Sequence, residues 1–217
     1  MTLKAGWAAL ALAATGCVAG GPASLPASVQ AAAANYPPMI LGGNVHPTDG
    51  HEVPPACAAA GTSVAQKGGP DFEFLGADPS NPELCVMKVG GETVKAWFDI
   101  WVTDWPGADD GHAALRQVIN GPSGSIAGFD TSMTTGNQWH DLVRNDGVED
   151  IALLGKAYRA LKISHYREGA NGNNYRSVST IWKDFPSGVL LYGTYQHIAG
   201  RPEIDDPLIP TAIVTGK

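Results

Sequence analysis

Turn-forming residues divide this chain into short segments, and their spacing limits the folds it can adopt. Its 217 residues include 27 glycines and 16 prolines, which together approach a fifth of the chain. Coiled coils and simple helical bundles need long segments with few turn residues, so the sequence excludes both classes. The glycines have no three-residue period, which excludes a collagen-like fibre. The length suits one domain of ordinary size together with a tail.

The first residues form a short apolar segment that ends at a cysteine. In MTLKAGWAALALAATGC, one cation (Lys4) precedes an apolar run over residues 5–14, and two small residues lead into Cys17. The run is shorter than the ~20 residues of a permanent membrane span. A positive start, a short apolar middle and small residues at the cut are typical of a secretory signal. An ordinary secretory signal that happens to contain a cysteine and is cut nearby accounts for this pattern.

Small-small-Cys at the end of such a signal resembles the bacterial lipobox. The resemblance implies that residues 1–16 are a signal peptide and that Cys17 becomes a lipid-carrying N-terminus. Residue 18 is Val and not Asp, which by the same resemblance implies an outer-membrane lipoprotein of a bacterial cell envelope that faces the periplasm or the cell surface. Residues 17–38 hold no charge and consist mainly of Ala, Pro, Ser and Gly. That composition is typical of a flexible linker.

The two remaining cysteines form an even pair in an exported chain. In an oxidising compartment, a disulfide between Cys57 and Cys85 is favoured over a metal-binding or catalytic role. Closing a loop of this length stabilises the folded state by about 3 kcal/mol.

Charge and motif content exclude several functions. The formal net charge is −7 and the pI is about 5.2, which excludes a nucleic-acid binder that works by general phosphate attraction. We expect no metal and no cofactor. The early segment contains three possible metal ligands, His46, Asp49 and His51, but its Pro and Gly residues explain it as a series of turns. The acidic residues near position 109 are explained by a helix N-terminus, where carboxylates offset the helix dipole. Gly121–Ser125 follows a helix, so it is not a phosphate loop.

The pattern of residues 39–217 predicts a disulfide-containing α+β domain, mostly antiparallel sheet, with one or two short helices. Strands are expected over 72–75, 84–89 and 93–103, with Gly90-Gly91 as a hairpin turn. A helix is expected from Asp109 or Asp110 to Ile119, followed by a loop over 121–137 and about two helical turns around residues 139–143. The last third predicts an antiparallel meander with strands over 157–168, 175–183 and 189–198, and 211–214 as an edge strand.

Alternation along residues 93–103 predicts one core face and one aromatic face. The expected core residues are Val94, Ala96, Phe98, Ile100 and Val102. The other face carries Trp97, Asp99 and Trp101, and flat indoles that flank a carboxylate suit a ligand with an apolar face. The alternative is that a helix covers this face and that the indoles belong to the core.

Two histidines lie on the polar faces of the expected meander strands. Strand parity places His165 on the same face as Arg167, and His197 on the same face as Tyr195. Such a polar sheet surface faces either a ligand or solvent. We therefore take Trp97, Asp99, Trp101, His165 and His197 as the candidate ligand-binding residues.

The sequence leaves two classes of function open. The first is a non-catalytic binding or scaffolding module of the cell envelope, held to the membrane by lipid, with a glycan, lipid or protein partner. The second is an envelope hydrolase in which His and carboxylate groups act as acid and base. The chain has no Gly-x-Ser-x-Gly motif. A deep pocket with His165 or His197 within hydrogen-bond reach of a carboxylate favours the enzyme, whereas a shallow aromatic groove favours binding.

Substitution of the lipobox cysteine tests the expected membrane anchor. Cys17→Ser removes the only thiol that the leader offers for lipid attachment, so the protein should stay unprocessed or become soluble. Detergent partitioning and labelling with a fatty-acid analogue measure this change. Identical partitioning and labelling of both proteins would contradict the lipoprotein interpretation.

Overall fold

Two antiparallel sheets and one helix make up the described chain. The structure is a computed structural model, and it describes residues 45–105, 107–132, 136–201 and 207–216. The expected signal peptide, Cys17 and the linker lie outside these residues. The prediction of a mostly antiparallel α+β fold is confirmed. Within the described ranges, no helix is long and apolar enough to span a membrane.

The larger sheet pairs its strands in the order β1-β8-β9-β10-β11, and β7 pairs with the first half of β8. Its strands are β1 (Val45–His46), β7 (Ile126–Ser132), β8 (Gln138–Leu153), β9 (Lys156–Gly169), β10 (Arg176–Asp184) and β11 (Leu190–Ala199). The expected meander over the last third of the chain corresponds to β9, β10 and β11.

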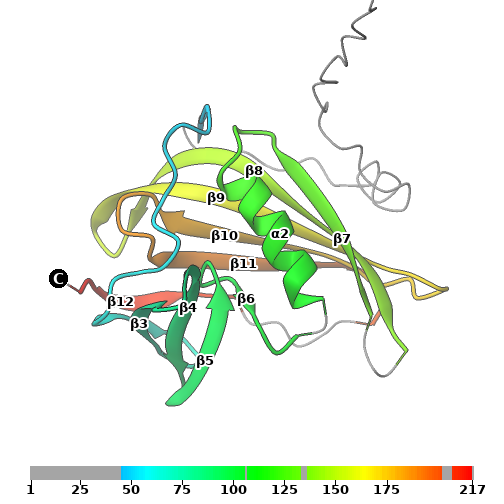
Figure 1. Ribbon diagram of the computed structural model, residues 1–217, viewed down its shortest axis with the longest axis horizontal. Coiled ribbons are helices and arrows are strands. Elements are labelled where there is room, and N and C mark those ends of the chain that lie inside the picture. The colour runs from blue at the N-terminus through cyan, green and yellow to red at the C-terminus, as the bar shows by residue number, and fades with distance from the viewer. Residues whose placement is uncertain (1–44, 106, 133–135, 202–206, 217) are drawn as a thin grey trace, which may run out of the picture.

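The smaller sheet pairs its strands in the order β12-β2-β3-β4-β5-β6 and lies near β11 (Figure 1). Its strands are β2 (Thr62–Gln66), β3 (Phe72–Asp78), β4 (Asn81–Val89), β5 (Glu92–Trp97), β6 (Trp101–Val102) and β12 (Pro210–Val214). Gly90 and Gly91 form the expected hairpin turn, and both have positive φ angles of 59° and 93°. Two-residue hairpin turns of this handedness favour glycine.

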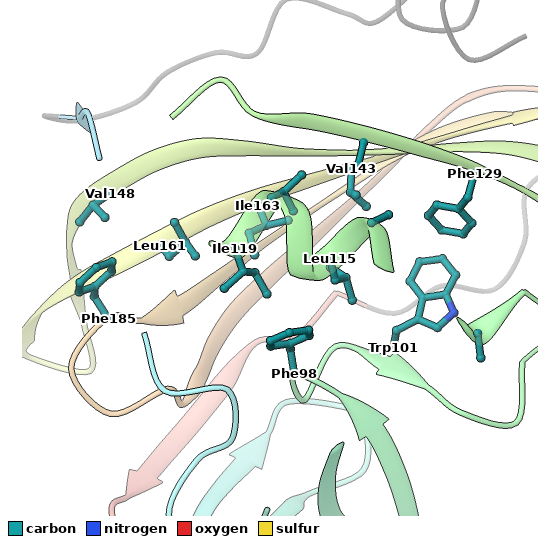
Figure 2. Packing of buried hydrophobic residues seen from close by; sticks show 14 residues of the cluster. Phe98, Trp101, Leu115, Ile119, Phe129, Val143, Val148, Leu161, Ile163 and Phe185 are labelled. Carbon is teal, nitrogen blue, oxygen red and sulfur yellow. The ribbon is translucent and has the colours of Figure 1, made fainter. Parts of the chain in front are cut away.

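The single helix of the described residues, α2 (Ala108–Ile119), crosses the face of the larger sheet (Figure 1). Asp109 and Asp110 lie in its first turn, where carboxylates offset the positive end of the helix dipole. Leu115 is fully buried, and in Figure 2 it points from the helix into the apolar cluster. Gly111 allows the indole of Trp101 to lie against the helix, because a Cβ there would be 3.1 Å from the ring.

The predicted continuous strand over 93–103 is wrong in its second half. The chain turns after β5, and β6 folds back so that Trp101 lies opposite Trp97. Phe98 and Asp99 in the turn have φ angles of 57° and 60°, a left-handed conformation that costs energy for residues other than glycine. The alternation of residue types did not reveal this turn, because contacts with distant elements impose it.

Three hydrogen bonds hold the turn at Phe98 and Asp99 in place. The Asp99 carboxylate accepts the backbone N–H of Ala58 at 2.9 Å. The buried ammonium group of Lys183, on β10, donates to the Phe98 carbonyl at 3.1 Å and to the Asp99 carboxylate at 3.3 Å. Asp99 is therefore buried and ion-paired rather than displayed beside two indoles.

Two further predictions between residues 121 and 147 are wrong. The expected loop over 121–137 contains strand β7, and the expected helical turns around residues 139–143 belong to the long strand β8. Residues 145–147 form a bulge inside β8, where the register shifts between Asn145 and Gly147. The Asn145 side chain accepts the N–H of Gly147 and donates to the carbonyl of Val118 on α2. The polar residues thus join the strand to the helix.

The disulfide between Cys57 and Cys85 is confirmed, with a Cα–Cα distance of 5.3 Å. It links the segment before β2 to β4 and so fixes the side of the smaller sheet that carries the Phe98 turn. Of the five predicted core residues, Ala96 and Phe98 are buried, whereas Val94, Ile100 and Val102 are partly buried. Trp101 is buried as well, beneath α2, as the covered-face alternative requires.

Truncation of two aromatic side chains measures this packing. Phe98→Ala should lower the free energy of unfolding by about 3–5 kcal/mol, because it leaves a cavity in the core. Trp101→Ala should cost a comparable amount, because α2 covers the indole. Val214→Ala is the control; this side chain is 60% exposed on the edge strand β12, so its truncation should change stability by less than about 0.5 kcal/mol. Denaturant unfolding curves give the three values. A Trp101→Ala variant as stable as Val214→Ala would contradict the packing of the indole beneath the helix.

Candidate ligand-binding site

A cavity of about 290 Å³ lies between α2, β6 and the face of the larger sheet that carries the helix. Its walls are mostly apolar, and its polar side chains come from β9 and β10. The lining residues are Ile100, Trp101, Val102, Trp105, Leu115, Val143, Ile163, His165, Arg167, Ser179 and Ile181. Pockets of this composition, apolar with a few polar groups at one end, are typical of small-molecule sites.

The sheet register explains why the polar residues meet. Val143 on β8 lies opposite His165 on β9, which lies opposite Ser179 on β10. Asp141 lies opposite Arg167 in the next row. Residues directly opposite or two apart on neighbouring strands share one face. The same alternation therefore gathers a carboxylate, an imidazole, a guanidinium and a hydroxyl at one end of the cavity.

The carboxylate of Asp141 is fully buried and accepts hydrogen bonds from three side chains. His165 Nε2 lies 2.7 Å and Arg167 Nε 2.7 Å from the same oxygen, Oδ1. The hydroxyl of Thr131 donates to Oδ2 at 2.6 Å. A buried carboxylate is stable only when it is paired and hydrogen-bonded, and these donors meet that requirement.

Burial and pairing act on the Asp141 carboxyl in opposite directions. Burial raises its pKa, but the hydrogen bonds and charges of His165 and Arg167 outweigh burial and lower the pKa to about 2. Asp141 therefore carries a negative charge at any pH at which the protein works. The guanidinium of Arg167 beside the cavity is held by this fixed charge.

Three indoles surround the guanidinium of Arg167. Its Cζ lies 5.9 Å from the ring centre of Trp101, 5.8 Å from that of Trp105 and 5.2 Å from that of Trp139. These cation–π contacts and the bond to Asp141 orient the group. Beyond Nε and a long contact of 3.5 Å from Nη2 to Asp141, its N–H groups have no partner among the described residues. Arg167 therefore offers unused donors at the cavity wall.

His165 and Ser179 complete the polar end. The imidazole lies edge-on to Trp101, with ring centres 5.1 Å apart, and its side chain is 21% exposed. The Ser179 hydroxyl has no hydrogen-bond partner within the described ranges. A histidine that binds a carboxylate and lies beside a serine has the composition of a nucleophilic site. Among the described residues, however, no hydrogen bond joins His165 to Ser179.

The structure separates the candidate residues of the aromatic strand. Trp101 lines the cavity, whereas Trp97 stacks on His112 of α2, with ring centres 3.7 Å apart and an angle of 7° between the planes. Asp99 lies in the buried pair with Lys183. Trp97 and Trp101 lie opposite each other and both contact α2, so the covered-face alternative describes the two indoles, and Asp99 lies apart from them. Their binding of a ligand remains a prediction, supported by the cavity only for Trp101.

The two candidate histidines also differ in position. His165 lines the cavity, whereas His197 is no lining residue and lies 3.0 Å from the backbone carbonyl of Gly200 through Nε2. The His197 ring lies 5.8 Å from that of Tyr175. Only His165 of the two is thus within hydrogen-bond reach of a carboxylate beside the cavity.

Two other polar clusters of the described chain have their binding groups occupied by one another. Glu83 on β4 binds both His112 and Arg116 of α2, which ties the helix to the smaller sheet. The sulfur atoms of Cys57 and Cys85 lie within 4.8 Å of an Asp99 oxygen, a grouping that resembles a metal site. Because the two sulfurs are bonded to each other, they offer no thiolate ligand.

Sequence reasoning missed Asp141, Ser179, Trp105 and Trp139. The signal for two of them was present, because Trp139, Asp141 and Val143 alternate with other residues as one strand face does. The helical interpretation of residues 139–143 concealed it. Arg167 was correctly placed on the same face as His165.

Acid titration tests the role of Asp141. A carboxyl whose pKa is lower in the folded state stabilises the fold above its unfolded pKa of 3.8, and this stabilisation disappears as the pH falls toward 2. The shift corresponds to about 2 kcal/mol of unfolding free energy lost between about pH 4 and pH 2. In Asp141→Asn this part of the pH dependence should be absent. Asp130→Asn removes an exposed carboxylate from β7 and should leave this part of the pH dependence unchanged. An unchanged pH dependence in Asp141→Asn would contradict the assignment.

Comparison of the chain with protein-family models, curated protein sequences and solved structures finds no match. The functional interpretation therefore depends on the geometry of the cavity alone.

Proposed function

We propose that this protein is a non-catalytic binding module that holds a small, largely apolar ligand in the cavity beneath α2. The single observation that carries the proposal is an apolar cavity of about 290 Å³ with preformed polar groups at one end. The leader supports an exported protein, anchored by lipid at Cys17 to the outer membrane of a bacterial envelope. Residues 18–38 would then connect this anchor to one domain over 39–217.

Contacts between the two sheets support the single domain. Phe98 comes from the turn between β5 and β6 and packs in the same cluster as Leu115 of α2 and Ile163 of β9 (Figure 2). A second cluster joins Phe74 and Met87 of the smaller sheet to Leu191 of β11. Both sheets therefore contribute to both apolar clusters.

A hydrolase is the second candidate, and one observation favours it. The distance of 2.7 Å from His165 to Asp141, beside a cavity, meets the criterion that the sequence set for an enzyme. Two observations favour binding instead. Arg167 shares the same carboxylate oxygen and already compensates its charge, and the Ser179 hydroxyl is not hydrogen-bonded to the imidazole.

A bulky substitution in the cavity tests the binding function. Val102→Phe places an aromatic ring in the cavity and should weaken the binding of octanamide, a small apolar probe, at least about tenfold. Val214→Phe is the matched control, because Val214 is exposed on the edge strand β12 and does not line the cavity. Isothermal titration calorimetry measures the dissociation constants.

Two outcomes would contradict this proposal. Equal affinity of both variants and the unchanged protein would place the probe elsewhere. Steady turnover of p-nitrophenyl octanoate that Ser179→Ala abolishes would show a hydrolase.

A further inference from the structure

We infer that the ligand of this cavity is a small monocarboxylic acid and that one proton enters the site with its carboxylate. This inference rests on the proposed binding function and names the ligand class for the same site. It follows from three features of the cavity: the kind of polar group exposed, the charge balance and the nature of the walls.

The polar end of the cavity offers mainly hydrogen-bond donors. The guanidinium of Arg167 presents N–H groups with no partner among the described residues, and the Ser179 hydroxyl can donate from the neighbouring strand. The acceptor atoms of Asp141 are already occupied by three donors. The complementary ligand group is therefore an acceptor, and a planar carboxylate matches the geometry of a guanidinium best.

The charges of the site require a proton when a carboxylate binds. Asp141 and Arg167 cancel each other, so an added carboxylate would leave a net negative charge in an apolar cavity, which is costly. Protonation of His165 restores neutrality, and its Nε2 already lies at the Asp141 carboxylate.

The surroundings of His165 contain few other charges. β8 presents Asp141, and β9 itself presents Arg167. β10 presents the Ser179 hydroxyl, and the next residue in that row is Tyr195 on β11, whose hydroxyl lies 3.0 Å from that of Tyr175. α2 and β6 present Leu115 and Trp101 to the cavity. The ionic state of the site thus depends on the carboxylate, the guanidinium and the imidazole.

The cavity walls determine the size and the apolar character of the ligand. Trp101, Trp105, Ile163 and Ile181 offer aromatic and branched aliphatic surfaces, and the volume admits on the order of ten non-hydrogen atoms. Octanoic acid has this size. Octanamide has the same number of non-hydrogen atoms and a similar polar end without the charge, so the two molecules form a matched pair of probes.

Calorimetric titration of the full chain with both probes at about pH 6 and about pH 8 tests the inference. Octanoate should bind at least about tenfold more tightly than octanamide at the lower pH, and its dissociation constant should rise by about tenfold or more at the higher pH. The binding of octanamide should not depend on pH. Titration in two buffers with different heats of ionisation should show proton uptake with octanoate alone.

A variant pair ties the proton to His165. In His165→Gln the dissociation constant of octanoate should be the same at both pH values, because the amide cannot take up a proton. His197→Gln, a histidine outside the cavity, should keep the pH dependence of the unchanged protein. Equal, pH-independent binding of octanoate and octanamide would overturn the inference and leave the binding function standing. Failure of both probes to bind would overturn the proposed function as well.

Discussion

The buried ion pair between Asp99 and Lys183 holds the smaller sheet against the larger one. Burial raises the pKa of the Asp99 carboxyl and lowers that of the Lys183 ammonium group, while the attraction between the two charges acts in the opposite sense. Loss of one partner would leave the other charge buried and unpaired, which typically costs about 3–5 kcal/mol. The same lysine also donates to the Phe98 carbonyl. The left-handed turn of Phe98 and Asp99 therefore persists because β10 supports it, and Trp101, two residues later, reaches the cavity wall.

Local chemistry made much of the fold predictable. Gly90 and Gly91 specify a hairpin by their own backbone freedom, and the helix over Ala108–Ile119 has acidic residues in its first turn and apolar residues at helical spacing. The disulfide was predicted from the pair of cysteines, Cys57 and Cys85, that remain after the leader. Each of these signals lies within a few residues of the structure it specifies, so the sequence is sufficient to find it.

Elements that depend on distant partners were not predictable in this way. The bulge at Asn145 and Gly147 contains the residues of a turn, and it is stabilised by distant partners: the Asn145 side chain donates to the carbonyls of Val118 on α2 and of Gly121. The turn at Phe98 and Asp99 looks like a strand because its stabilising partners come from Ala58 and Lys183. The candidate site likewise contains some residues that the sequence predicted and others that it did not. Strand parity placed His165 with Arg167, but Asp141 was hidden in a segment whose helical spacing arises from burial on both faces of β8.

The carboxylate of Asp141 links the stability of the sheet to the chemistry of the cavity. It holds Arg167 among three indoles and binds His165, so the donors at the cavity wall keep their orientation before any ligand arrives. Because the surroundings are apolar, the charges at this end of the cavity interact more strongly than they would in water. A neutral total charge of the occupied site therefore becomes the condition for ligand binding. A substitution at Asp141 would change the fold and the charge of the site together. The two effects are separable by changing the ligand or His165, because neither change removes the ion pair between Asp141 and Arg167.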